Sequence, residues 1–201
     1  MMERAAVSGA LMELLDRQRE PSAEEVDYRP FPDIDRRNAW QETLELPALV
    51  WALGLREGCR VLEVGCGRGV ALPVLARLLR PKRFTGLDID GALLRHARSR
   101  AQGLAIDLLE GDVRGLPFPE ASFDLVVDFG TCYHISRQVQ ALREIARVLA
   151  VGGRFVYETR ASQLLAHPVR SWGRRLPWYG VPELAPERHA LLWASRVKWG
   201  R

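Results

Sequence analysis

The sequence has 201 residues, of which 47% are hydrophobic and 27% are charged, and its formal net charge is +4. This length suits one domain with a full core, and the composition is ordinary for a globular protein. Apolar runs are too short to span a membrane, and no basic-then-apolar leader opens the chain, so we expect a cytoplasmic protein. Three cysteines, at positions 59, 66 and 132, show no C-x-x-C spacing, which argues against a disulfide framework and a metal site.

The charge is distributed unevenly along the chain. Residues 160–201 hold eight Lys or Arg against two acids, whereas residues 1–159 hold 21 basic against 23 acidic residues. Four of the six tryptophans lie in the same basic segment, at 172, 178, 193 and 199. Such a segment suits anionic lipid, nucleic acid or an acidic substrate. The interpretation that we favour is simple exposure of charged side chains around packed aromatics.

The first 54 residues are expected to form a helical cap. An amphipathic pattern predicts a helix over residues 5–19, and a charged, proline-rich loop follows over residues 20–38. A second helix is expected from about Ala39 to Leu53. We therefore divide this single-domain chain into an N-terminal lid, residues 1–54, and a main part, residues 55–201.

A glycine-rich turn follows the first strand of the main part. Residues 61–64 (Val-Leu-Glu-Val) predict a short buried strand, and glycines follow at 65, 67 and 69. The apolar spacing of residues 72–79 then predicts a helix that ends before Pro81. Glycines let the main chain approach a ligand, and amides at a helix start bind a carboxylate or hydroxyl. The spacing is G-x-G-x-G, which differs from the G-x-G-x-x-G of dinucleotide-binding folds.

Acidic residues mark the first three predicted strands. Glu63 lies in the first, Asp88 ends a strand over residues 83–88, and Asp112 follows a strand over about residues 105–109. Asp88 comes 25 residues after Glu63, near the ~20-residue separation at which nucleotide-binding folds place a ribose carboxylate. The three acids together favour a ligand site over three unrelated surface acids.

The later elements continue the alternation of strands and helices. A fourth strand is predicted at residues 123–128, and its following loop lies at the carboxyl edge where open α/β sheets bind ligands. Ser136 is expected to cap the next helix. The inner face of that helix is expected to carry Val139, Leu142, Ala146 and Leu149. Further strands are expected at residues 154–159, 176–181 and 190–197.

Taken in order, these motifs resemble those of the class I S-adenosylmethionine (SAM)-dependent methyltransferases with a type 11-like domain. The glycine turn with its preceding acid is similar to motif I of that family, and residues 111–124 are similar to motif II. Residues 146–155 resemble the Leu-x-Pro-Gly-Gly motif, with Val151 in the proline position. The resemblance covers roughly residues 55–160. It implies an α/β, Rossmann-like fold: seven mostly parallel strands, helices on both faces and an antiparallel last strand.

The resemblance also implies SAM as the cofactor. In this family Asp88 would accept both ribose hydroxyls, the Asp112 carboxylate would accept the adenine amine, and the Val113 amide would meet a ring nitrogen. The cofactor-binding candidates are Glu63, Gly65, Cys66, Gly67, Asp88, Ile89, Asp112, Val113 and Phe129. N-terminal elements of the family commonly form a lid. The lid candidates here are Tyr28, Arg37 and Trp40, and plain packing of that segment is the alternative.

Tyr133 and His134 are the candidates for catalysis. Methyl transfer from a sulfonium is an in-line displacement, so the protein mainly holds acceptor and methyl ~3–3.5 Å apart and excludes water. A general base helps when the acceptor is a hydroxyl, and an imidazole, with an ordinary pKa of about 6.5, suits that task. We therefore assign proton removal to His134 and acceptor orientation to Tyr133. The alternative for His134 is packing at the helix start.

The predicted function is methyl transfer from SAM to oxygen, nitrogen or carbon of a small molecule. The pI of 9.3 suggests an RNA methyltransferase as an alternative. No aromatic-interleaved RNA module is present, so nucleic acid is not the expected partner. A cofactor-binding partner subunit without catalysis is another alternative, and a homodimer is compatible with the sequence. A nicotinamide dehydrogenase fits less well, because the glycine spacing and Asp112 match SAM better.

Overall fold

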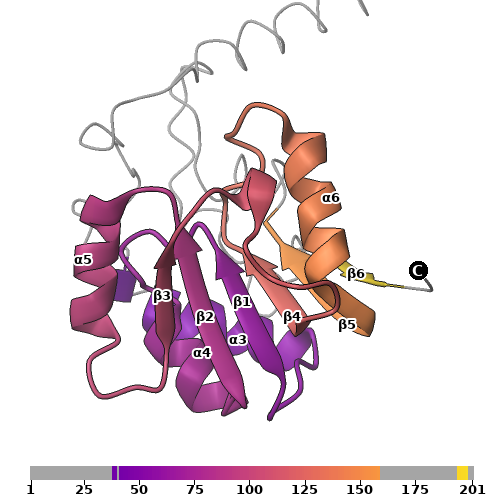
Figure 1. Cartoon of the computed structure of the whole chain (residues 1–201). Coiled ribbons are helices and arrows are strands. Elements are labelled where there is room, and N and C mark those ends of the chain that lie inside the picture. The colour runs from indigo at the N-terminus through magenta and orange to yellow at the C-terminus, as the bar shows by residue number, and fades with distance from the viewer. Residues whose placement is uncertain (1–37, 40, 159–193, 199–201) are drawn as a thin grey trace, which may run out of the picture.

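The computed structural model describes residues 38–39, 41–158 and 194–198, which are arranged as Figure 1 shows. A π-helical turn, η1, and a 3-10 turn, η2, accompany four α-helices and six strands in these residues. In chain order the elements are η1 (Gln41–Glu45), α3 (Leu46–Ala52), β1 (Arg60–Val64), α4 (Leu72–Leu79), β2 (Arg83–Asp88), α5 (Gly91–Arg100), β3 (Asp107–Glu110), η2 (Val113–Gly115), β4 (Phe123–Asp128), α6 (Gln138–Val148), β5 (Leu149–Tyr157) and β6 (Ala194–Val197).

The strands form one sheet in the order β3-β2-β1-β4-β5-β6. The five strands from β1 to β5 run parallel to their neighbours, and β6 is antiparallel to β5. The strand order reverses between β1 and β4, which is the switch point where open α/β sheets bind ligands. The structure thus confirms the α/β class and an antiparallel final strand. It contains six strands in the described residues, and the strand predicted at residues 176–181 lies outside them.

Helices cover both faces of the sheet, as predicted (Figure 1). One face packs against α3, α4 and α5, and the other packs against α6 and η2. Alternate residues of β1 supply the two faces, because side chains alternate along a strand. The first core includes Leu49, Val61, Leu75, Phe84, Leu94 and Val127, and the second includes Leu62, Val64, Val126, Ile145 and Val148.

Several predicted elements have the expected bounds. β2 and β4 span residues 83–88 and 123–128, and α4 spans residues 72–79. α4 ends because Arg80 adopts a left-handed conformation, at φ 41°, immediately before Pro81. The helix predicted near residues 39–53 is also present, as η1 followed by α3, and Gly54 at φ 56° follows its end.

The predicted inner face of α6 is wrong. Ala141, Ile145 and Val148 face the core, whereas Val139 is 61% and Leu142 38% exposed. Ala146 is exposed too, and Leu149 is buried as the first residue of β5.

The predicted cap of α6 is also wrong. Arg137, in the left-handed conformation at φ 57°, precedes the helix, and no side chain caps it. The Ser136 hydroxyl instead accepts from the Arg114 guanidinium at 3.1 Å.

β5 begins earlier than the predicted Arg154. It follows α6 without a loop, and its pairing with β4 shifts register between Phe123 and Leu125. The extra residues of β5 include Gly152, at φ 80°, whose amide donates to the Lys198 carbonyl beyond β6. Beyond this register shift, the carboxyl ends of β4 and β5 are aligned, with Asp128 opposite Tyr157.

Candidate active site

Acidic residues line the carboxyl edge of the parallel strands. Asp88 and Asp128 end β2 and β4, and Glu63 is the penultimate residue of β1. Glu158 directly follows β5, and Asp112 comes two residues after β3. Because the five strands β1 to β5 are parallel, their carboxyl ends lie at one edge of the sheet, and these acids gather there. An edge with this charge favours a cationic ligand over an anionic pyrophosphate.

The glycine turn after β1 has the backbone that its sequence requires. Gly65, Gly67 and Gly69 have φ values of 64°, 50° and 76°, which only glycine adopts readily. A Cβ on Gly65 would lie 1.7 Å from Thr131 Oγ1, and one on Gly69 would lie 2.9 Å from the Ala97 Cα. A Cβ on Gly67 would have no atom within 4 Å. The turn is thus tightly packed at both ends and open in the middle, where a ligand can approach the main chain.

Asp88, the last residue of β2, is hydrogen-bonded to this turn. Its Oδ2 accepts the Gly67 amide at 2.7 Å, and its Oδ1 accepts the Asp90 amide at 2.9 Å. The residue is 7% exposed. Each carboxylate oxygen can accept more than one hydrogen bond, so hydroxyl groups of a ligand have acceptors left at this position.

Glu63 is a buried acid with unmet hydrogen-bonding capacity. It is 3% exposed, and its Oε2 has no hydrogen-bond partner among the residues that the structure describes. Burial raises the pKa of Glu63 to about 8, and the neighbouring Asp88 and Asp128 act in the same direction. A cation at this edge would stabilise the charged form of Glu63.

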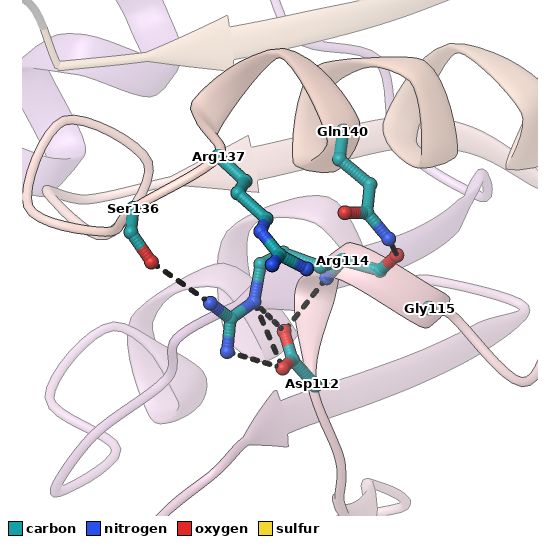
Figure 2. Close-up of a pocket in the computed structure, with 6 residues that line it drawn as sticks. All are labelled: Asp112, Arg114, Gly115, Ser136, Arg137 and Gln140. Carbon is teal, nitrogen blue, oxygen red and sulfur yellow. Dashed lines mark hydrogen bonds and ion pairs between the residues drawn. The ribbon is translucent and has the colours of Figure 1, made fainter.

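Asp112 lies in a polar pocket between η2 and the start of α6. This pocket has a volume of about 540 Å³ and is lined by Asp112, Arg114, Gly115, Ser136, Arg137 and Gln140 (Figure 2). The Arg114 guanidinium donates to both Asp112 oxygens, with the shortest contact at 2.6 Å. It holds the pKa of that carboxyl below its usual range. An adenine amine at Asp112 would therefore have to share the carboxylate with Arg114.

The loop after β4 is shaped by Asp128. Its Oδ1 accepts the amides of Gly130 and Thr131 at 3.0 and 2.6 Å, and its Oδ2 accepts the Cys132 amide at 3.0 Å. Asp128 is 1% exposed. One carboxylate thus fixes the chain that leads to Tyr133 and His134.

Replacement of Asp128 by alanine is expected to destabilise the fold by about 2–3 kcal/mol, because three amides lose their acceptor. Chemical denaturation measures this change. Asp107→Ala is the control, since Asp107 is exposed at the start of β3 and forms a 3.6 Å ion pair with the exposed Arg83. An equal effect of the two substitutions would contradict the role of Asp128.

The structure brings Tyr133 and His134 together. Their ring centroids are 4.2 Å apart at an interplanar angle of 52°. The Tyr133 hydroxyl donates to Glu158 Oε2 at 3.2 Å, so the β4 loop is joined to the end of β5. His134 is exposed, and its amide donates to the Thr131 carbonyl.

The other predicted cofactor residues occupy varied surroundings. Cys66 is buried under the turn, and burial raises the pKa of its thiol. Ile89 is 64% exposed beside Asp88, whereas Val113 is buried in η2. Phe129 is partly buried against the first core. The lid candidates Tyr28, Arg37 and Trp40 lie outside the described residues, as does most of the basic segment.

Sequence reasoning missed several residues of the site. Asp128 was seen only as a strand end, although an Asp two residues before a Gly is a turn signal. Glu158 was seen only as part of a strand, and Thr131 as part of a loop. Their contacts to Tyr133 and Gly65 join segments 25 and 66 residues apart, which local patterns do not reveal.

Two features are absent from the residues that the structure describes. In that part of the chain, no helix is long and apolar enough to cross a membrane. The same residues contain no group of three or more His, Cys, Asp or Glu side chains arranged to hold a metal ion.

Comparison with known proteins shows what this chain is similar to. Residues 62–157 match the model described as a methyltransferase domain. Fatty-acid O-methyltransferase of Mycolicibacterium smegmatis is 38% identical over 120 residues, which are 60% of this chain and 43% of that protein. Phthiotriol/phenolphthiotriol dimycocerosates methyltransferase 1 of Mycobacterium ulcerans is 42% identical over 103 residues, 50% of this chain and 37% of that protein.

A solved structure agrees in fold. The crystal structure of a SAM-dependent methyltransferase from Aquifex aeolicus superposes with a TM-score of 0.55 at 22% identity, over 59% of this chain and 65% of that one. The likeness at this identity concerns the fold. This chain covers less than half the length of either of the two curated relatives.

Proposed function

We propose that this chain, whose residues 62–157 match the model of a methyltransferase domain, is a class I SAM-dependent methyltransferase that transfers the methyl group of SAM to a small, lipid-like acceptor. The row of acids along the carboxyl edge, crossed by the open glycine turn, is the observation that carries the proposal. SAM is cationic at its sulfonium, so this edge attracts it, whereas a dinucleotide pyrophosphate would be repelled. The buried, unpartnered Glu63 Oε2 and the open space at Gly67 support the fit.

The cofactor residues follow from the order of the strands. Asp88 on β2 would accept the ribose hydroxyls, and Asp112 beyond β3 would accept the adenine amine. Glu63, Gly65, Cys66 and Gly67 would form the floor of the site on β1, with Ile89 and Val113 beside the adenine and Phe129 beside the methionine part. When bound, SAM supplies a methyl group already activated by its sulfonium. The chain itself then has to hold the acceptor in line and exclude water.

The names of the relatives support a lipid-like acceptor. One is named for fatty acids and the other for phthiotriol dimycocerosates. Tyr133 and His134 are the proposed acceptor-facing residues, since they follow β4 at the edge beyond the glycine turn.

The binding site is tested at Asp88. Asp88→Ala should weaken the binding of both SAM and S-adenosylhomocysteine by about 1.5–3 kcal/mol, because charge-assisted bonds to the ribose are lost. Isothermal titration calorimetry measures both affinities. Asp107→Ala, at the amino end of β3 and away from the carboxyl ends of the strands, should leave both affinities unchanged. Unchanged affinity in Asp88→Ala would remove the ribose assignment. Binding of NADH in place of SAM would overturn the proposed function.

A further inference from the structure

The pair formed by Tyr133 and Glu158 is a part of the site that the predicted SAM residues do not include. β4 and β5 end side by side, with Asp128 opposite Tyr157, and the Glu158 amide donates to the Asp128 carbonyl at 2.9 Å. The Tyr133 hydroxyl reaches Glu158 Oε2 at 3.2 Å. Catalytic hydrogen bonds are often this long before a ligand binds.

The main chain makes room for this pair at Gly130. A Cβ at this position would lie 2.8 Å from Tyr133 Oη and 3.0 Å from Glu158 Oε2. Gly130 also has φ 113°, where a side chain is disfavoured. The phenol and the carboxylate therefore lie directly against the backbone of the β4 loop, and any side chain at residue 130 would displace them.

The position of the pair follows from the strand order and rests on the proposed function. If the ribose is held at β2 and the turn after β1 lies under the methionine part, the cofactor runs across the edge towards β4 and β5. Tyr133 and Glu158 lie at the ends of these two strands. An acceptor approaching the methyl group from this side would meet the phenol.

The hydrogen bond decides what the phenol can do for an acceptor. A tyrosine hydroxyl has one proton to donate and lone pairs to accept with, and a carboxylate only accepts. Since the Tyr133 proton is directed to Glu158, the phenol oxygen offers its lone pairs to other groups. A neutral hydroxyl can donate to it, whereas a carboxylate cannot.

We propose that the acceptor group is a neutral hydroxyl and that Glu158 is a positioning residue that takes up the acceptor's proton through Tyr133. The acceptor oxygen attacks the methyl carbon, and the methyl–sulfur bond breaks with its electron pair on sulfur. The acceptor proton passes to the Tyr133 oxygen as the Tyr133 proton passes to Glu158. The products are the methyl ether, neutral S-adenosylhomocysteine and a protonated Glu158.

This arrangement gives His134 a secondary place. Its ring lies against the Tyr133 ring, and its side chain is exposed. The sequence assigned proton removal to His134 and a smaller role to Tyr133. The contact with Glu158 favours the reverse order, with His134 supporting the orientation of the phenol.

The experiment compares two acceptors that differ in the group to be methylated. 4-Nonylphenol offers a neutral hydroxyl, and hexadecanoate offers a carboxylate that has no proton to lose. Formation of S-adenosylhomocysteine is measured for the full chain and for Glu158→Gln, Glu158→Asp, Tyr133→Phe and His134→Ala. Glu57→Gln is the matched control, since Glu57 is exposed near the carboxyl end of α4, where it lies 3.9 Å from the Arg80 guanidinium.

With 4-nonylphenol, Glu158→Gln should lower kcat about 100-fold while the KM for SAM stays the same, as expected for loss of proton uptake. Glu158→Asp should recover part of that loss. Tyr133→Phe should resemble Glu158→Gln, and His134→Ala should have a smaller effect than either. Any residual activity with hexadecanoate should be equal in Glu158→Gln and the unsubstituted chain.

Equal losses on both acceptors, no loss in Glu158→Gln, or a larger loss in His134→Ala than in Glu158→Gln would overturn the inference. If Glu158→Gln fails to fold, Tyr133→Phe decides the same question. Failure of the proposed function looks different, because the unsubstituted chain would then transfer methyl to neither acceptor. That result would remove the inference as well.

Discussion

Replacement of Gly65 by alanine is expected to destabilise the folded chain by about 3–4 kcal/mol and to abolish tight SAM binding. Two effects add at this position. The backbone is left-handed, at φ 64°, and the new Cβ would lie 1.7 Å from Thr131 Oγ1. Thr131 cannot withdraw freely, because Asp128 holds its amide at 2.6 Å. Urea denaturation measures the free energy of unfolding, and calorimetry measures SAM binding.

Two matched variants separate the backbone strain from the contact. Gly54 has φ 56°, and a Cβ added there would have no atom within 4 Å, so Gly54→Ala should lose only about 1 kcal/mol. Adding Thr131→Gly to Gly65→Ala should recover most of the difference. If Gly65→Ala loses no more free energy of unfolding than Gly54→Ala, Thr131 does not restrict the size of the side chain at residue 65. The β4 loop and the glycine turn would then be independent.

Elements with a clear signal at each end could be predicted from the sequence. The helix over residues 72–79 lies between a glycine turn and Pro81, and β4 is a largely apolar run that ends at an acid. The structure has both elements over the predicted residues. The glycine turn was predicted for a similar reason, since three glycines at alternating positions indicate a backbone that other residues adopt poorly. Local sequence determines local backbone here, and no distant contact was needed.

The face of α6 shows where local reasoning fails. Two apolar stripes of similar spacing run along this helix, and the sequence alone favours neither. Tertiary contacts decide: Glu144 accepts the Leu116 amide at 2.9 Å, and Arg147 donates to the Leu116 and Phe118 carbonyls at 2.8 and 2.7 Å. These bonds turn Ala141, Ile145 and Val148 towards the sheet.

The site divides in the same way. The positions of Asp88 at the end of β2 and of Asp112 beyond β3 could be predicted from strand ends and motif spacing, and their roles towards the cofactor are proposals. Asp128, Thr131 and Glu158 act through partners on other strands, and the sheet order that joins β4 to β5 and β1 is a property of the whole fold. The roles proposed for these residues therefore depend on the structure, and the experiments above address them one by one.

Glu63 should make the stability of the free protein depend on pH in an unusual direction. Burial raises its pKa from the ordinary 4.5 to about 8, so between these values the folded chain holds a proton that the unfolded chain releases. Raising the pH through this window therefore lowers the free energy of unfolding, by roughly 5 kcal/mol at most. Below the window and above it, Glu63 contributes no further change. Asp112, Asp124 and Glu144 have lowered pKa values and act at more acidic pH.

Glu63→Gln isolates this effect, because glutamine has the same shape and no charge. The free energy of unfolding, measured in urea between pH 5 and pH 9 without ligand, should fall less steeply in Glu63→Gln than in the unsubstituted chain. The difference between the two should grow up to about pH 8 and then stay constant. The contributions of groups that both chains share cancel in this difference, and the curve of Glu57→Gln should run parallel to that of the unsubstituted chain. Parallel curves for Glu63→Gln would mean that burial does not raise the pKa of Glu63 in the folded protein.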